Sequence, residues 1–312
     1  MNETDRVFVA GHRGLVGAAI LRELRRRGFD NLLLRTRQEL DLTVESQVRD
    51  LFAKEKPVIV IDAAAKVGGI LANDSYPADF IRDNLRIQTN LIDAAFDHGV
   101  EKFVFLGSSC IYPRVAAQPI SEDALLTGPL EPTNEAYAIS KIAGIKMCQA
   151  YRKQHGFNAI CLMPTNLYGP GDNFDLQTSH VLPALIRKFH EATLSDADTV
   201  EIWGTGTPRR ELLYVDDLAD AVVFLTKNYD EGDIINVGTG EDIEIRDLAR
   251  LVARIVGFAG DLRFDSSKPD GSPRKLLDIS RLKSLGWEPT WQLEDGIAST
   301  YEWFKSCEGK TT

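Results

Sequence analysis

Up to about residue 165, short runs of β-branched and aliphatic residues alternate with longer segments whose apolar residues recur at helical spacing. This alternation predicts repeated βαβ units, because parallel neighbouring strands need a crossover connection that is usually a helix. We therefore expect an α/β fold built on a doubly wound parallel sheet. The expected strands lie near residues 6–10, 31–35, 58–62, 102–107 and 157–163, and the helices near 15–28, 44–55, 77–98 and 133–155.

Beyond Pro164 the chain changes character and becomes punctuated by glycine and proline, as in the segments 168–171, 203–208 and 268–273. Such segments are typical of turns between short elements. We predict a dinucleotide-binding domain over residues 1–165, to which some later segments return, and a smaller, mainly substrate-binding lobe over 166–312. Further helices are expected near 181–191, 216–227, 245–257 and 294–305.

Charge and composition exclude several classes of protein. The net charge is −10, and no block of basic residues exists beyond Arg25–Arg27, which argues against nucleic acid as a partner. The longest apolar stretch, residues 58–65, is far shorter than the roughly 20 residues that span a bilayer. The N-terminus lacks the features of a secretory signal, so we expect a cytoplasmic protein. Four cysteines without a CxxC pair predict reduced thiols and no metal site.

A glycine-rich loop follows the first expected strand and opens the first expected helix. Glycines are required in such a loop because the turn is tight, the backbone approaches a pyrophosphate, and the helix packs closely on the strand. Three glycines in a turn also occur by chance, but this position at the start of a βαβ series is typical of a dinucleotide site and a Rossmann-like domain. The predicted cofactor contacts in the loop are Gly11, His12, Arg13, Gly14, Leu15, Val16 and Gly17.

The end of the second expected strand distinguishes the two nicotinamide cofactors. NAD needs an acidic residue there to hold the ribose 2′-OH. This chain instead carries Arg35 and Arg37, whose guanidinium groups suit the 2′-phosphate of NADP, and Arg13 could reach the same group. We therefore predict NADP(H), with Arg37 as its main ligand. The alternative is that these arginines are solvated surface charges. Asp41 and Leu42 are expected to line the adenine pocket.

A serine, a tyrosine and a lysine have the spacing needed to reduce a carbonyl group. Tyr137 and Lys141 stand four residues apart on an expected helix and so share one face. We expect the lysine cation to lower the pKa of the phenol, which would then donate a proton to the carbonyl oxygen. Ser108 ends the fourth expected strand, where its hydroxyl can hydrogen-bond the same oxygen.

These motifs, in this order, resemble the extended short-chain dehydrogenase/reductases. Longer segments resemble the GDP-L-fucose synthase family in particular, and the likeness extends over nearly the whole chain. The segments that carry it are 11–17, 63–70, 106–113, 131–141, 163–170, 179–181, 235–240 and 268–275.

The resemblance implies an activity on a sugar nucleotide. That family epimerises C3 and C5 of GDP-4-keto-6-deoxy-D-mannose and then reduces C4 with NADPH to give GDP-L-fucose. Carried over by position, Ser108, Tyr137 and Lys141 would serve the reduction, while Cys110 and His180 would be the base and the acid of the epimerisation. The resemblance also implies a homodimer.

Further binding residues follow from the resemblance alone. At Lys188 the family pattern predicts an arginine, so this chain would hold the diphosphate with a point charge in place of a fork. The implied cofactor residues are Leu106, Gly107, Ser109, Lys141, Pro164, Thr165, Asn166, Leu167 and His180, and the implied substrate residues are Asn166, Lys188, Trp203, Arg210, Asp270 and Lys275.

Three alternatives stay open at this point. The chain could be a synthase of the GDP-colitose type or a one-step 4-keto reductase acting on a related sugar nucleotide. Cys110 and His180 favour chemistry that includes epimerisation, although a cysteine after a strand can also be a small buried apolar residue. The chain could also be a non-catalytic NADP-sensing scaffold, which the presence of serine, tyrosine and lysine together disfavours.

Overall fold

The computed structural model describes residues 1–268 and 270–308, so Pro269 of the segment 268–275 and the last four residues of the predicted lobe lie outside the described residues. The centre of the described chain is a parallel sheet with the strand order β10-β5-β4-β3-β1-β2. The sheet is formed by β1 (Val7–Ala10), β2 (Leu32–Leu33), β3 (Ile59–Asp62), β4 (Lys102–Leu106), β5 (Ala159–Pro164) and β10 (Ile235–Val237).

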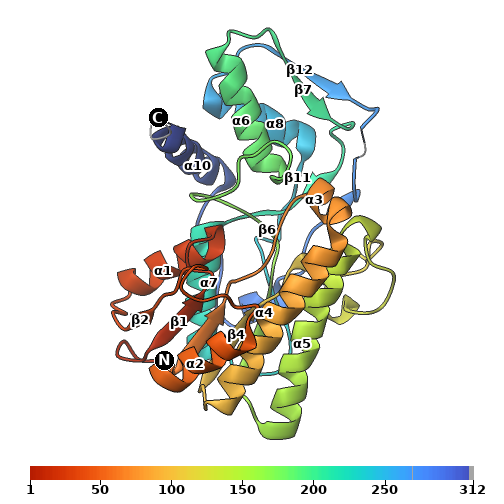
Figure 1. Ribbon diagram of the computed structural model, residues 1–312. Helices are drawn as coiled ribbons and strands as arrows, with labels where there is room; N and C mark the ends of the chain where they lie inside the picture. The colour runs from red at the N-terminus through yellow and green to blue at the C-terminus, as the bar shows by residue number, and fades with distance from the viewer. Residues whose placement is uncertain (269, 309–312) are drawn as a thin grey trace.

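Helices cover both faces of this sheet, which confirms the predicted doubly wound fold (Figure 1). The helices α1 and α7 pack against each other on one face, while α2, α4 and α5 pack on the other. All predicted helices are present, with ends within three residues of those expected. The bounds are α1 (Leu15–Arg26), α2 (Glu45–Glu55), α3 (Ile70–Ser75), α4 (Pro77–Asp97), α5 (Glu135–His155) and α7 (Val215–Asn228).

The strands read as continuous apolar runs because both faces of the sheet are buried. Phe8 and Val60 lie in the core beneath α2, α4 and α5, whereas Val9 and Ile61 lie in the core beneath α1 and α7. Asp62 breaks this pattern, because it is a carboxyl group that is only 1 % exposed at the carboxyl end of β3.

A third core lies in the lobe at the top of Figure 1, formed mainly by α6, α8 and α10 beside the strand pair β7-β12. Among the described helices, none has the length and apolar character that crossing a membrane requires. The bounds are α6 (Val181–Leu194), β7 (Thr199–Trp203), α8 (Ile245–Val256), β12 (Asp261–Asp265) and α10 (Leu293–Glu308).

Several very short elements join the large sheet to this lobe, and the sequence predicted none of them. Two small sheets form here, a three-stranded one in the order β11-β8-β13 and the pair β6-β9. The bounds are β6 (Asn166–Tyr168), β8 (Arg209–Arg210), β9 (Leu212–Tyr214), β11 (Ile243–Glu244), β13 (Arg274–Lys275) and α9 (Ser280–Ser284), with 3₁₀ turns η1 (Ser109–Ile111), η2 (Glu122–Ala124) and η3 (Pro132–Asn134).

Candidate active site

The glycine loop joins β1 to α1 at the carboxyl edge of the large sheet. Gly11 adopts a φ of 77°, and a Cβ atom there would lie 2.7 Å from the carbonyl oxygen of Ala63, so only glycine fits. Gly14 caps α1 without a side chain, which leaves the first N–H groups of the helix able to meet an anion. The loop therefore fits the pyrophosphate of a dinucleotide.

The arginines that could bind a 2′-phosphate differ in their surroundings. The guanidinium of Arg35 donates to Glu55 at 2.9 Å and to the carbonyl oxygen of Leu34. Arg13 and Arg37 are exposed, and neither forms an ion pair with another described residue. Arg35 is thus engaged by the protein itself, which leaves Arg13 and Arg37 as candidates.

The other predicted cofactor residues lie near the same edge. Asp41 accepts hydrogen bonds from the backbone and hydroxyl of Thr43, and Asn90 holds the carbonyl of Leu42 at 2.9 Å. The His12 side chain keeps a buried Nδ1 that has no hydrogen-bond partner among the described residues. The strands β4 and β5 end at the same carboxyl edge of the sheet, with Leu106 and Pro164 as their last residues, and Gly107, Ser109, Thr165 and Leu167 come shortly after them.

The structure brings Ser108 and Tyr137 together. Ser108 directly follows β4, and its hydroxyl hydrogen-bonds the phenol of Tyr137 from the first turn of α5. Lys141 lies one turn further along α5, where its ammonium donates to the carbonyl oxygen of Leu106 at 2.8 Å. It also lies 4.8 Å from the centre of the Phe105 ring.

One electrostatic expectation is wrong. Burial, followed by the nearby Cys110 thiol, raises the pKa of Tyr137, and Lys141 does not lower it in this structure because its ammonium is turned to Leu106. Burial likewise lowers the pKa of Lys141, while the carboxylate of Asp62 acts in the opposite direction.

Asp62 is a residue that the sequence reasoning missed as part of this site. One of its oxygens accepts from the N–H of Ala64 at 3.1 Å, and the other has no partner among the described residues. Burial raises the pKa of Asp62 to about 6, although Lys141 favours its ionised form. Its position as the single charge within the apolar run 58–65 was the signal that could have found it.

Cys110 lies in η1, two residues beyond Ser108. Its N–H donates to the Ser108 hydroxyl at 3.2 Å, and its Sγ accepts from the Lys275 ammonium at 3.3 Å. Burial alone would raise the pKa of the Cys110 thiol, but Lys275 and the Ser108 hydroxyl outweigh it, so the pKa is lowered. The thiol is therefore a stronger candidate base than an ordinary cysteine.

His180 is the N-cap residue of α6 and lies within electrostatic range of Lys275, whose ammonium contacts Cys110. The segment before it is fixed because the N–H of Gly69 donates to Thr178 at 2.9 Å, and a Cβ at Gly69 would lie 2.7 Å from the carbonyl of Ser179. Gly69 is thus a second positioning residue that the sequence reasoning missed. Desolvation by the surrounding atoms, followed by the charge of Lys275, lowers the pKa of His180.

The cations predicted for the substrate lie in two groups. Arg210 on β8 is the register partner of Lys275 on β13, and its guanidinium donates to the carbonyl of Ser272 at 2.7 Å. In the second group, the Lys188 ammonium lies 5.5 Å from the Trp203 ring, which is 56 % exposed.

Two polar residues connect these groups to the rest of the site. Asp270 lies within electrostatic range of Arg210, and its carboxylate accepts from the N–H of Thr205 at 2.7 Å, next to Trp203. Asn166 donates to the carbonyl of Glu211 at 3.0 Å, immediately before β9.

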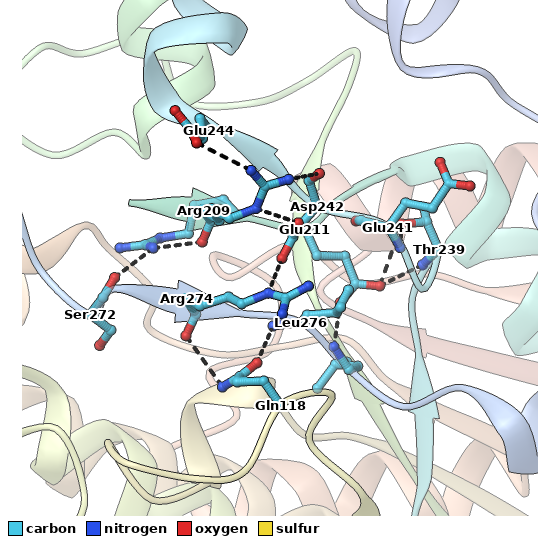
Figure 2. A network of polar contacts seen from close by, with 12 residues as sticks. Gln118, Arg209, Glu211, Thr239, Glu241, Asp242, Glu244, Ser272, Arg274 and Leu276 are labelled. Atoms are coloured by element: carbon cyan, nitrogen blue, oxygen red, sulfur yellow. Dashed lines mark hydrogen bonds and ion pairs between the residues drawn. The ribbon is translucent and has the colours of Figure 1, made fainter. Parts of the chain in front are cut away.

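Glu211 is a fully buried residue that the sequence reasoning also missed. One of its oxygens accepts from the N–H of Thr239 (Figure 2) and from that of Gly240, and the other accepts from the N–H of Leu277. These donors come from segments far apart in the chain. A lone acid before the apolar run Leu212–Val215 is a weak signal for such a role.

Among the known protein families, the sequence pattern of the NAD dependent epimerase/dehydratase family matches residues 7–238, and the chain belongs to this family. GDP-L-fucose synthase 1 of Arabidopsis thaliana is 61 % identical over 97 % of the chain and 94 % of that protein. GDP-L-fucose synthase of Escherichia coli is 55 % identical over 96 % of each. Among solved structures, a GDP-mannoheptose C4 reductase from Campylobacter jejuni with NADP bound is 41 % identical, with a TM-score of 0.90 over 98 % of this chain and 99 % of that one.

Proposed function

We propose that this chain converts GDP-4-keto-6-deoxy-D-mannose to GDP-L-fucose by epimerisation at C3 and C5 and NADPH-dependent reduction at C4. The observation that carries the proposal is that the Lys275 ammonium donates to the Cys110 sulfur at 3.3 Å and lies within electrostatic range of His180, while Tyr137, beside Ser108, lies within electrostatic range of the same sulfur. A one-step reductase needs Ser108 and Tyr137 but not Cys110 and His180.

The cofactor is NADP(H), and the residues present fit it. Gly11, Gly14 and Gly17 form the cradle for the pyrophosphate, because a side chain at Gly11 or Gly17 would collide with backbone. Arg13 and Arg37 supply the cations for the 2′-phosphate. When bound, the cofactor supplies the hydride that reduces C4.

In the reduction, Tyr137 donates the proton that the C4 oxygen requires, and the Ser108 hydroxyl orients that oxygen. Because burial raises the pKa of Tyr137, the phenol is protonated near neutral pH and ready to donate. Lys141 is held by the carbonyl of Leu106 and carries the positive charge of this end of the site.

In the epimerisation, the Cys110 thiolate removes a proton from the carbon next to the ketone. The C–H bond breaks, an S–H bond forms, and the electron pair moves into an enolate whose charge lies on the C4 oxygen. His180 then returns a proton to the opposite face of the carbon. A C4 ketone acidifies both C3 and C5, so one pair of residues can serve both centres.

Relatives that are 55–61 % identical over nearly the whole chain are named as GDP-L-fucose synthases, which supports the complete reaction over the two enzymatic alternatives. Serine, tyrosine and lysine in one site argue against a scaffold without chemistry.

The test is to incubate the purified chain with GDP-4-keto-6-deoxy-D-mannose and NADPH in deuterated water and to identify the sugar by NMR. We expect GDP-L-fucose with deuterium at C3 and C5 and none at C4. Cys110→Ser should lose most of the exchange, because a serine hydroxyl cannot act as the base near neutral pH. Reduction without exchange in the wild type would contradict the proposal and indicate a one-step reductase.

The assigned site residues are part of this proposal, as are three coarser features. We propose a division at about residue 165, with β10 and α7 returning to the first domain, which is supported by the separate core around α6, α8 and α10. We also propose a homodimer in the cytoplasm, on the likeness to the family. Light scattering of the purified chain and microscopy of a tagged copy test these two points.

A further inference from the structure

Lys275 differs from the other cations around the Cys110 thiol. Arg114 and Glu131 line the same cleft and pair with each other at 3.3 Å, and Arg274 pairs with Asp242. Within the described part of the chain, Lys275 has no carboxylate partner, and its ammonium donates to the Cys110 sulfur. The other titratable groups of this cluster are Tyr137 on α5, which is neutral near pH 7, and His180, whose pKa is lowered by desolvation and then by Lys275. The nearest unpaired charge to the sulfur is therefore positive.

The backbone on both sides of Lys275 is fixed by side chains from other segments. Gln118 donates to the carbonyl of Arg274 at 3.3 Å and accepts from the N–H of Leu276 at 2.9 Å (Figure 2). Glu211 holds the N–H of Leu277 at 2.9 Å. These hydrogen bonds fix the backbone on either side of Lys275 and so restrict where its side chain can point.

Arg274, the neighbour of Lys275, is held from the other direction. Asp242 binds Arg209 at 2.7 Å and also binds Arg274, so both guanidinium groups lie on the side of the small sheet that Asp242 occupies (Figure 2). Successive side chains of a strand point to opposite faces. The pairing of Arg274 with Asp242 thereby directs Lys275 to the face on which Cys110 lies.

We propose that Lys275 is a positioning residue that activates Cys110, and that the two form a lysine–cysteine pair whose resting state is ammonium and thiolate. The role in epimerisation rests on the proposed function, but the thiolate itself does not. In the pair, the thiol proton passes to solvent and the ammonium keeps all of its protons. The sulfur then takes a proton from carbon, and the C–H electron pair forms the enolate.

The same ammonium also acts on His180, whose pKa it lowers. A lower pKa makes the protonated imidazole a stronger acid, which suits a group that must return a proton to an enolate. The Lys275 ammonium would therefore favour the thiolate form of Cys110 and would make protonated His180 a stronger proton donor.

The test measures the thiolate directly, without any sugar. Alkylation of Cys110 by iodoacetamide is followed against pH in a Cys307→Ser background, because Cys307 is partly exposed while Cys148 and Cys161 are buried. In Lys275→Met the midpoint of the pH profile should move upward by about 1 to 3, the range expected when an adjacent opposite charge is lost. Lys275→Arg should restore most of the wild-type profile.

The matched control is Lys268→Met, which removes a cation of the neighbouring segment whose ammonium lies over the Trp203 ring. Its alkylation profile should equal that of the wild type. If Lys275→Met does not fold, as judged by NADPH binding and circular dichroism, Lys275→Gln takes its place.

An alkylation profile that is unchanged by the loss of the ammonium would overturn the proposal. If that unchanged profile came with a large loss of GDP affinity, Lys275 would be a ligand of the diphosphate alone. If Lys275→Met shifts the alkylation profile but the wild type does not epimerise the keto-sugar, the proposed function is refuted and the lysine–cysteine pair stands.

Discussion

Asp62 is a buried carboxyl group of the large sheet and Glu211 is one beside the small sheet β11-β8-β13, and the two groups are satisfied differently. Asp62 at the edge of the large sheet has one oxygen without a partner and a pKa raised to about 6. Glu211, which directly follows β8, has both oxygens satisfied by backbone N–H groups. A buried carboxyl without partners costs stability, whereas one with several donors holds segments together.

The contrast between Asp62 and Glu211 indicates that the two sheets that carry the site are stabilised in different ways. The large sheet is stable through two apolar cores, so it tolerates Asp62 at its edge beside Lys141. The small sheet has two-residue strands, and its geometry depends on Glu211 and Asp242. We therefore expect the reduction residues to be insensitive to changes in the small sheet, and Lys275 to be sensitive.

The largest expected effect lies at the edge of the large sheet. Tyr137→Phe removes the proton donor and should lower the rate of NADPH consumption about 10²- to 10⁴-fold. NADPH affinity, measured by fluorescence, should not change. Tyr151→Phe on the same helix is the control, because that hydroxyl binds Asp93 away from the cleft. A Tyr137→Phe enzyme with most of its turnover would require another acid.

The next effect tests the small sheet. Glu211→Ala leaves the N–H groups of Thr239, Gly240 and Leu277 without their acceptor and should cost about 3 kcal/mol or more in the free energy of unfolding. Urea denaturation measures this cost, and the exposed Glu241→Ala should change stability by less than about 0.5 kcal/mol.

The functional consequence of Glu211→Ala separates the two sheets further. The variant should keep NADPH binding and lose the low midpoint of Cys110 alkylation, because the strand that carries Lys275 is released. Equal losses of cofactor binding and of thiol reactivity would mean that the two sheets respond as one unit.

The Asp62 carboxyl should affect the free energy of unfolding by a similar amount, and its effect should depend on pH. Its pKa is raised from about 3.9 in the unfolded chain to about 6 in the folded one. The protonated form is therefore favoured by folding, and this contribution is present below pH 4 and lost as the pH rises through 6. Relative to Asp62→Asn, the wild type should lose up to about 3 kcal/mol over that window. Urea unfolding at pH 4 and pH 8 measures the difference, and a pH-independent difference would contradict it.

The smallest effect compares two arginines beside the large sheet. Arg37→Ala should weaken NADPH binding by about 1.5–3 kcal/mol, because a charged hydrogen bond to the 2′-phosphate is lost, and should leave NADH binding unchanged. Arg35→Ala is the matched control, since its guanidinium is occupied by Glu55. Isothermal titration with both cofactors distinguishes them, and a larger loss in Arg35→Ala would exchange the two assignments.

By itself, the sequence did not indicate β10, the sixth strand of the large sheet. It did determine the other five strands, the covering helices, the glycine loop, and the grouping of Ser108, Tyr137 and Lys141. These features follow from local periodicity and from short motifs, and parallel strands necessarily bring their carboxyl ends to one edge. The expected orientation of Lys141 toward Tyr137 did not follow, because the carbonyl of Leu106 and the carboxyl of Asp62 compete for the ammonium.

Only the tertiary structure placed Lys275 against Cys110, 165 residues away in the chain. Two-residue strands have no periodicity that a sequence pattern could reveal, and their partners come from segments near residues 118, 211 and 242. The sequence was equally unable to reveal the roles of the buried acids Asp62 and Glu211. Their effects depend on which donors the fold brings within hydrogen-bond distance, so a charge in an apolar run indicates that a role exists, and packing decides what the role is.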